Sequence, residues 1–161
     1  MSAAVRFESG SEADTERLAE ALAPWLEPGD VIALQGPLGA GKTRFVAGLA
    51  RGIEARARVR SPSFTLVQEY HGRLTLVHAD LYRLVPAEAS ELGLEEALER
   101  AALVVEWAER LPAALRADAL VVRFVVSRGD ARTLEARASG TRSRRLLARW
   151  RETRVPAGGA A

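Results

Sequence analysis

The octapeptide GPLGAGKT at residues 36–43 places the narrowest limit on how this chain can fold. It fits the pattern G-x-x-x-x-G-K-[ST] without a gap, and that pattern needs a strand before it and a helix after it. Residues 31–34 form an apolar run short enough for a buried strand, and a helical pattern starts at about residue 42. In this setting the glycines let backbone N–H groups converge on phosphate oxygens, helped by the positive end of the helix dipole. The motif predicts a P-loop that binds a nucleoside triphosphate.

Lys42 is the only lysine in a chain with 23 lysines and arginines. Arginine is a rigid planar fork, whereas lysine carries a compact ammonium group on a thin, flexible stem. A position that keeps lysine while every other basic residue is arginine indicates a need for that thin stem. Lys42 is therefore expected to reach the β- and γ-phosphates, and the Thr43 hydroxyl is expected to bind Mg²⁺.

A P-loop also needs an acidic residue at the end of a neighbouring strand, to hold Mg²⁺ directly or through water. Asp80 closes the run LTLVHAD, and Glu106 lies within ALVVEW. The sequence pattern does not show which of the two carboxylates holds Mg²⁺. Phosphoryl transfer can use both, one for the metal and one to orient the nucleophile. His78 is interpreted as a core or supporting residue rather than a metal ligand, and Trp107 as a residue that shapes the site.

Strand-like runs alternate with helical patterns along the chain, which predicts an α/β fold. Hairpin turns expected around residues 71–72 and 128–130 predict a mixed central β-sheet flanked by helices, in a three-layer fold typical of P-loop NTPases. The sequence contains no repeat or linker, so one domain is expected over residues 1–154, with a flexible tail at 155–161. Strands are expected at 3–7, 31–34, 67–70, 74–79, 103–106, 120–126 and 133–138; helices are expected at 9–26, 42–52, 86–100 with a break near Gly93, and 142–151.

The composition limits the cellular compartment, the metal sites and the partners that can be expected for the protein. There is no cysteine, hence no disulfide and no cysteine-based metal site. The first residues lack the basic start and apolar run of a signal peptide, and no segment approaches the roughly 20 apolar residues that cross a bilayer. A cytoplasmic protein without a membrane partner is expected. Residues 123–161 carry ten arginines and three acidic residues, which suits either an anionic partner or a solvated helix face.

Several classes of P-loop protein are excluded. A common GTPase needs an N/T-K-x-D motif to read guanine, and this chain has no asparagine and a single lysine. ABC-type ATPases need an LSGGQ-like signature that is missing here, and helicase or AAA engines need modules that 161 residues cannot hold. A small kinase or a small stand-alone ATPase is left.

Four motifs in this order resemble the TsaE (YjeE) family, the P-loop ATPases of bacterial tRNA threonylcarbamoyladenosine biosynthesis. They are GPLGAGKT, SPSFTLVQEY, HADLYRL and VVEWAERLP, within about residues 11–110. Ser63 stands where threonine is commoner in the family, which preserves the hydroxyl. Ala79 replaces a usual aromatic residue, which affects local packing but not the carboxylate of Asp80.

The resemblance implies roles for particular residues. The nucleotide would be bound by the backbone from Gly39 to Thr43 and by Arg44, with Thr15 near it. Thr43 and Glu106 would serve Mg²⁺, and Asp80 would lie near the γ-phosphate as a catalytic or water-positioning group. The hydroxyl-rich segment SPSFT, residues 61–65, would be a switch loop that senses the γ-phosphate. The site residues carried over or expected are Thr15, Gly39, Ala40, Gly41, Lys42, Thr43, Arg44, Ser61, Ser63, Thr65, Asp80, Glu106 and Trp107.

The resemblance also implies a function. TsaE-like proteins act on a complex of TsaB and TsaD that modifies position 37 of ANN-decoding tRNAs, and they use ATP and Mg²⁺. A weak ATPase that these partners activate is expected, with tRNA reached only through the complex. One alternative is a small-metabolite kinase with Asp80 as base and a lid of Arg142, Arg144 and Arg145. Another is a nucleic-acid-binding module that uses the basic C-terminal third directly.

Overall fold

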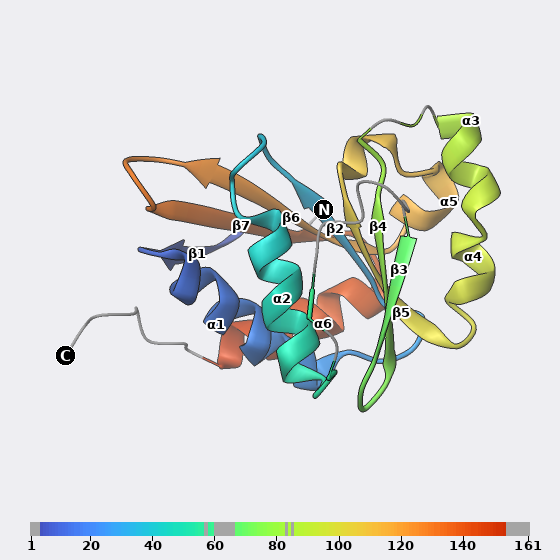
Figure 1. Cartoon of the computed structure of the whole chain (residues 1–161), viewed down its shortest axis with the longest axis horizontal. Helices are drawn as coiled ribbons and strands as arrows, with labels where there is room; N and C mark the ends of the chain where they lie inside the picture. Colours follow the sequence, from blue (N-terminus) through green and yellow to red (C-terminus); the bar gives the residue numbers. More distant parts are fainter. Residues whose placement is uncertain (1–3, 57, 60–66, 83, 85, 154–161) are drawn as a thin grey trace.

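One seven-stranded sheet runs through the molecule in the order β1-β7-β6-β2-β5-β4-β3 (Figure 1). The structure, a computed structural model, describes residues 4–56, 58–59, 67–82, 84 and 86–153. The expected tail at 155–161 and the hydroxyl-rich segment with Ser61, Ser63 and Thr65 lie outside the described residues. The strands are β1 (Val5–Ser9), β2 (Val31–Gln35), β3 (Val67–His71), β4 (Thr75–Asp80), β5 (Ala101–Glu106), β6 (Ala119–Val126) and β7 (Arg132–Ala138).

The sheet is mixed, as expected from its hairpins. Strand β2 is parallel to both β5 and β6, and β4 is parallel to β5. The pairs β3–β4, β6–β7 and β1–β7 are antiparallel. Because β2, β4 and β5 run in one direction, their carboxyl ends meet at one edge of the sheet, which is where open α/β sheets bind ligands.

Helices cover both faces of the sheet, which confirms the expected three-layer α/β fold. They are α1 (Glu12–Leu22), α2 (Lys42–Gly52), α3 (Pro86–Ala89), α4 (Leu94–Ala97), α5 (Ala113–Arg116) and α6 (Thr141–Glu152), with the short 3₁₀ helices η1 (Ala23–Trp25), η2 (Ser90–Leu92) and η3 (Ala108–Arg110). None of the helices within the described ranges is long and apolar enough to cross a membrane.

The first helix starts later and ends earlier than its sequence pattern predicted. Ser11 is the N-cap, and its side chain accepts the Asp14 N–H at 3.1 Å. In the sequence, Ser9 followed by Glu12 and Ser11 followed by Asp14 both fit a helix-capping pattern, but Ser9 ends β1 instead. The α-helix stops at Leu22 because Pro24 has no N–H for a regular helical bond, so the chain tightens into η1. Leu26 was expected inside the helix and lies beyond it in extended conformation, still fully buried.

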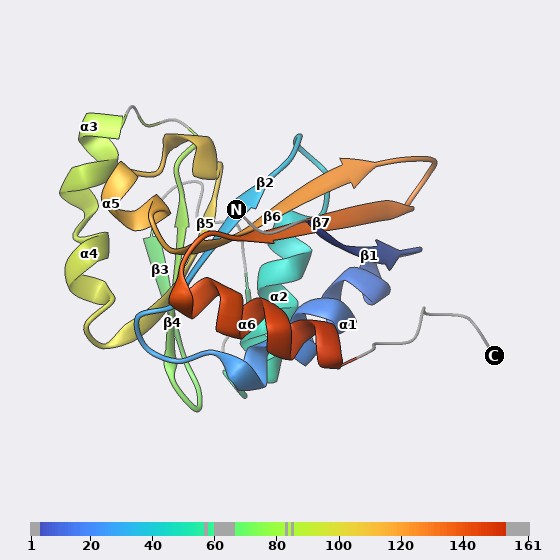
Figure 2. The ribbon, with the colours of Figure 1, turned by 180° about the vertical axis from the view of Figure 1, so that it is seen from behind.

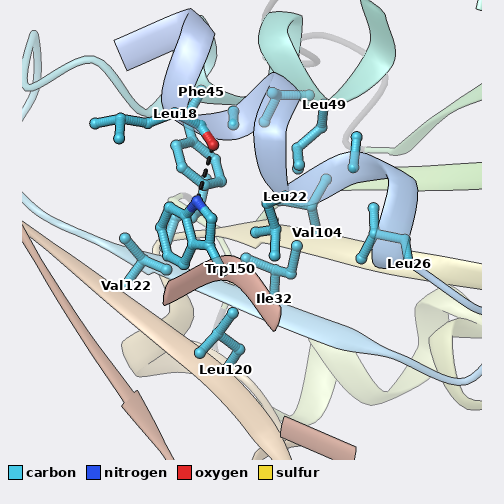
Figure 3. Packing of buried hydrophobic residues seen from close by; sticks show 14 of the residues in the cluster. Leu18, Leu22, Leu26, Ile32, Phe45, Leu49, Val104, Leu120, Val122 and Trp150 are labelled. Atoms are coloured by element: carbon cyan, nitrogen blue, oxygen red, sulfur yellow. Dashed lines mark hydrogen bonds between the residues drawn. The ribbon is translucent and has the colours of Figure 1, made fainter. Parts of the chain in front are cut away.

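The larger core lies between the sheet and α1, α2 and α6, which share one side of it in both ribbon views (Figures 1 and 2). Trp150 of α6 is fully buried there. Its ring stacks on the Phe7 ring, with the ring centroids 4.0 Å apart. Its indole Nε1–H donates to the Leu18 carbonyl at 2.9 Å (Figure 3). The indole thus ties α6 to α1 while the polar nitrogen keeps a partner.

The second face of the sheet carries α3, α4 and α5 over β2, β4 and β5. Successive side chains of β2 point to opposite faces of the sheet, so this strand contributes to the cores on both sides. Ile32 and Leu34 enter the larger core, whereas Val31 and Ala33 pack on the other side. A strand buried on both faces reads as a continuous apolar run, which is why residues 31–34 were recognisable in the sequence.

Candidate functional site

The glycine-rich loop leaves β2 after Gln35 and enters α2 at Lys42. Gly39 and Gly41 have φ angles of 77° and 106°, in the left-handed region that side chains disfavour. The chain needs these angles to reverse within a few residues and place the first turn of α2 at the carboxyl edge of the sheet. The unpaired N–H groups of that first turn are therefore available to an anion.

A cavity of about 230 Å³ opens beside this loop. It brings together residues from the loop, from the ends of β4 and β5, and from the start of α1. Most of the residues predicted for the site line it: Gly39, Gly41, Lys42, Thr43, Arg44, Asp80, Glu106 and Trp107. Ala40 lies in the loop but is fully buried.

Lys42 lies beneath this loop with only 5% of its surface exposed. Its ammonium donates to the Gly36 carbonyl at 2.5 Å and lies 3.7 Å from the centroid of the Trp107 ring. Burial lowers the pKa of Lys42, and the negative charges of Glu106, Glu109 and Asp80 oppose part of that shift. A buried cation between a carbonyl and an aromatic face gains charge-assisted contacts if a phosphate enters the cavity.

Glu106, at the end of β5, connects the loop to the sheet. The Thr43 hydroxyl donates to its two carboxylate oxygens at 3.2 and 3.4 Å. His78 Nε2 lies 2.6 Å from Oε2 of the same carboxylate, and the imidazole is fully buried. His78 therefore supports the carboxylate from behind, in agreement with its interpretation as a core or supporting residue.

Asp80 and Glu106 are directly paired across the parallel strands β4 and β5. Adjacent residues on parallel strands point to the same side of the sheet edge, so both carboxylates face the cavity. Oδ1 of Asp80 accepts the Tyr82 N–H at 3.0 Å, which orients the carboxylate. The sequence suggested each residue separately; the register of the two strands makes them neighbours.

The oxygen donors suit a magnesium ion that arrives with a nucleotide. Mg²⁺ binds one or two protein oxygens and fills its remaining positions with phosphate oxygens and water. The Thr43 hydroxyl and Glu106 carboxylate supply two such oxygens side by side. Over the part of the chain that the structure describes, no cluster of three or more His, Asp or Glu side chains could hold a metal ion by itself.

Trp107 shapes the cavity through an unusual backbone. Its φ angle of 60° is in the left-handed region, which is costly for a non-glycine residue. That conformation turns the indole over the Lys42 ammonium, and the Tyr82 ring packs on it at 4.6 Å. The tryptophan thus forms a wall beside the lysine.

Thr15 is buried behind the loop and does not line the cavity. Its hydroxyl lies 2.7 Å from the Ser9 hydroxyl, and its Cγ2 lies 3.8 Å from the position of a Cβ built on Gly41. Contact with a nucleotide by Thr15 stays a prediction.

Sequence reasoning missed some residues at the site. Glu12 and Leu38 line the cavity, and Glu12 also pairs with Arg44 at 3.2 Å. Arg132 of β7 donates to the loop carbonyls of Gly39 and Ala40. Arg132 and the loop are about ninety residues apart, so no spacing in the sequence relates them. The sequence expectation also began the strand at residue 133, and Arg132 belonged to no motif.

The arginines assigned to a kinase lid lie elsewhere. Arg142 and Arg145 of α6 contact Asp30, which directly precedes β2 and is 1% exposed. This is the amino end of β2, whereas the glycine-rich loop leaves its carboxyl end. Arg144 bonds the Ser139 carbonyl at 3.5 Å. Their contacts with Asp30 place Arg142 and Arg145 at the end of β2 opposite the cavity, which argues against a lid formed by these two residues.

Comparisons with known proteins agree with this geometry. The sequence model of one family, described as threonylcarbamoyl adenosine biosynthesis protein TsaE, matches residues 9–134. A Treponema pallidum protein named tRNA threonylcarbamoyladenosine biosynthesis protein TsaE is 44% identical over 113 residues, covering 69% of this chain and 84% of the relative. A Bacillus subtilis protein of the same name is 37% identical over 131 residues, covering 80% and 82%. The crystal structure of YdiB from Bacillus subtilis superposes with a TM-score of 0.79 at 32% identity, covering 94% of this chain and 97% of that one.

Proposed function

The chain belongs to the TsaE family, and from this membership and the cavity we propose that it binds and hydrolyses ATP as an accessory protein of threonylcarbamoyladenosine formation in tRNA. The observation that carries the ATPase assignment is the convergence of Lys42, Thr43, Asp80 and Glu106 on one cavity at the carboxyl edge of the sheet. A site that only bound nucleotide would not need two adjacent carboxylates there.

Each residue has a role in the proposed reaction. The loop N–H groups and the Lys42 ammonium bind the β- and γ-phosphates. Thr43 and Glu106 hold Mg²⁺, which when bound neutralises negative charge on the phosphates. Asp80 orients a water molecule in line with the γ-phosphorus and accepts its proton. The water oxygen forms the new bond to phosphorus, the bond to the β-phosphate oxygen breaks, and ADP leaves.

The isolated chain should hydrolyse ATP slowly, because few cations face the γ-phosphate. Among the described residues, Lys42 and Arg44 are the basic side chains that line the cavity. Arg44 is already paired with Glu12 and Glu16, each at 3.2 Å. Phosphoryl transfer is accelerated strongly by an added cation at the γ-phosphate. We propose that the family's TsaB–TsaD complex supplies such a cation. Contact with tRNA is made through that complex.

Phosphate release from ATP by the purified chain, alone and with TsaB and TsaD from the same organism, tests the proposal. We expect a slow basal rate that the pair raises many-fold. The variant Asp80→Asn keeps the size of the side chain and should lose this activity while still binding ADP. Activity of Asp80→Asn equal to wild type would contradict the assigned role. Phosphate appearing on a small molecule, without activation by the pair, would favour a kinase.

A further inference from the structure

Arg132, at the start of β7, reaches across to the phosphate loop. Its Nε–H donates to the Ala40 carbonyl at 3.1 Å, and a terminal nitrogen donates to the Gly39 carbonyl at 3.3 Å. The other terminal nitrogen donates to the carbonyls of Gly129 and Ala131, at 2.7 and 3.0 Å. The guanidinium therefore fastens the turn between β6 and β7 to the middle of the loop.

These bonds fix how the loop peptides point. In a trans peptide the C=O and the following N–H point in opposite directions. Holding the Ala40 carbonyl on the Arg132 side therefore turns the Gly41 N–H away from it, and Gly41 lines the cavity. The preceding peptide is held at both ends, because the Gly39 carbonyl accepts from Arg132 and the Ala40 N–H donates to the Pro37 carbonyl at 3.1 Å. Glycines on their own would leave these peptides free to rotate.

The charge of Arg132 also acts on the cavity. Within the described ranges, Arg132 forms no ion pair with a carboxylate, in contrast to Arg44, Arg51, Arg142 and Arg145. Its guanidinium donates to carbonyl oxygens, and among the peptides that it holds, the Ala40–Gly41 peptide has its N–H at Gly41, which lines the cavity. An unneutralised cation behind the loop makes the potential at the phosphate position more positive.

We propose that Arg132 is a positioning residue that holds the phosphate loop in its anion-binding form and adds a permanent positive charge behind it. The proposal rests on the proposed nucleotide binding. It assigns a role in recognition of the polyphosphate group, not of the base, to a residue of the C-terminal part of the chain.

The test compares Arg132→Gln with Arg132→Lys and with Arg128→Gln. Arg128 lies exposed in the same turn, so its neutralisation removes an equal charge without touching the loop. The dissociation constants of ADP and of inorganic triphosphate would be measured by calorimetry for each protein, and the unfolding midpoint without ligand would be recorded. Inorganic triphosphate reports on the phosphate contacts alone.

Arg132→Gln should weaken both ligands by the same factor, about tenfold or more, because bonds from a charged donor are lost. Arg132→Lys should fall between this variant and wild type, since it keeps the charge but not the fork. Arg128→Gln should match wild type. Unchanged ligand affinity in Arg132→Gln, or an equal loss in Arg128→Gln, would overturn the proposal. If Arg132→Gln does not fold, the same ligand measurements on Arg132→Lys decide, with wild-type affinity overturning it. Failure of the wild-type chain to bind ADP would instead refute the proposed function.

Discussion

Replacing Lys42 by methionine should abolish tight nucleotide binding without weakening the fold. Methionine has nearly the length and volume of lysine, so it can fill the same buried position under Trp107. It removes the ammonium that donates to the Gly36 carbonyl and that would contact the phosphates. The two consequences, a large loss of binding and a small change in stability, can be worked out separately.

The loss of binding follows from one charge-assisted contact. A hydrogen bond to a charged group contributes about 1.5–3 kcal/mol, so ADP should bind about 10- to 100-fold more weakly to Lys42→Met. Stability changes little, because burial already disfavours the charged lysine, as its lowered pKa shows. Removing the ammonium relieves that cost but loses the charge-assisted bond to Gly36, worth about 1.5–3 kcal/mol, so the two effects largely offset each other. The free energy of unfolding should stay within about 1 kcal/mol of wild type.

The pH dependence of stability has a definite sign. Because the folded pKa of Lys42 lies below its unfolded value, the destabilisation by the ammonium is complete below the folded pKa. It is relieved as the pH rises from the folded pKa toward the unfolded value near 10.5. The stability of Lys42→Met relative to wild type should therefore be greatest at neutral pH and should decline in alkaline solution.

Calorimetry with ADP and urea unfolding between pH 7 and about pH 10 would check these values. The control is Arg100→Gln, which removes an exposed cation paired with Glu69 and should leave ADP binding unchanged. Lys42→Arg is a second probe: the larger guanidinium must displace the Trp107 ring, at a cost of about 1–3 kcal/mol from overpacking. Wild-type ADP affinity in Lys42→Met would refute the reasoning. So would a loss of more than about 2 kcal/mol in stability, which would mean that the ammonium stabilises the fold.

Three further changes test other parts of the structure. Glu106→Gln should slow ATP hydrolysis by about 100-fold, measured as phosphate release, while ADP binding in the presence of EDTA persists; magnesium-dependent turnover at the wild-type rate would contradict this. Asp30→Asn neutralises a buried partner of Arg145, which keeps its contacts with Glu27 and the Trp25 carbonyl. It should cost about 1–3 kcal/mol in urea unfolding, with unchanged ADP affinity because Asp30 lies at the other end of β2. Burial of Asp118 acts to raise its pKa, but hydrogen bonds from Ser143 and the Arg142 N–H outweigh this and lower it. Asp118→Asn should therefore reduce stability at pH 7, and the difference from wild type should vanish as the pH falls below about 4.

The secondary structure around the site was predictable because its signals are local. The apolar run at 31–34 and the glycine-rich loop identify β2 and the start of α2, and Gly93 does break the helical segment, with a φ angle of 72°. The errors were at boundaries. The proline at position 24 ends α1 before Leu26, and two overlapping capping patterns at Ser9 and Ser11 could not be ranked without the position of β1.

The site was predictable to different degrees for different residues. Lys42 and Thr43 follow from a continuous motif, and Asp80 and Glu106 from their places at strand ends. Whether the two carboxylates are neighbours depends on the pairing of β4 with β5. Charge alone was not a sufficient guide. Arg142 and Arg145 have the charge that a kinase lid needs, but the fold places them beside Asp30.

The sequence by itself determined the P-loop, its lysine, the α/β class and the family, since each depends on residues that are close together in the chain. The tertiary structure decided which distant residues serve that loop. His78 lies behind Glu106, Trp107 lies over Lys42, and Arg132 holds the loop carbonyls. These contacts depend on strand order and register, which arise from packing of the whole sheet, and no local pattern encodes the distance between residues on different strands.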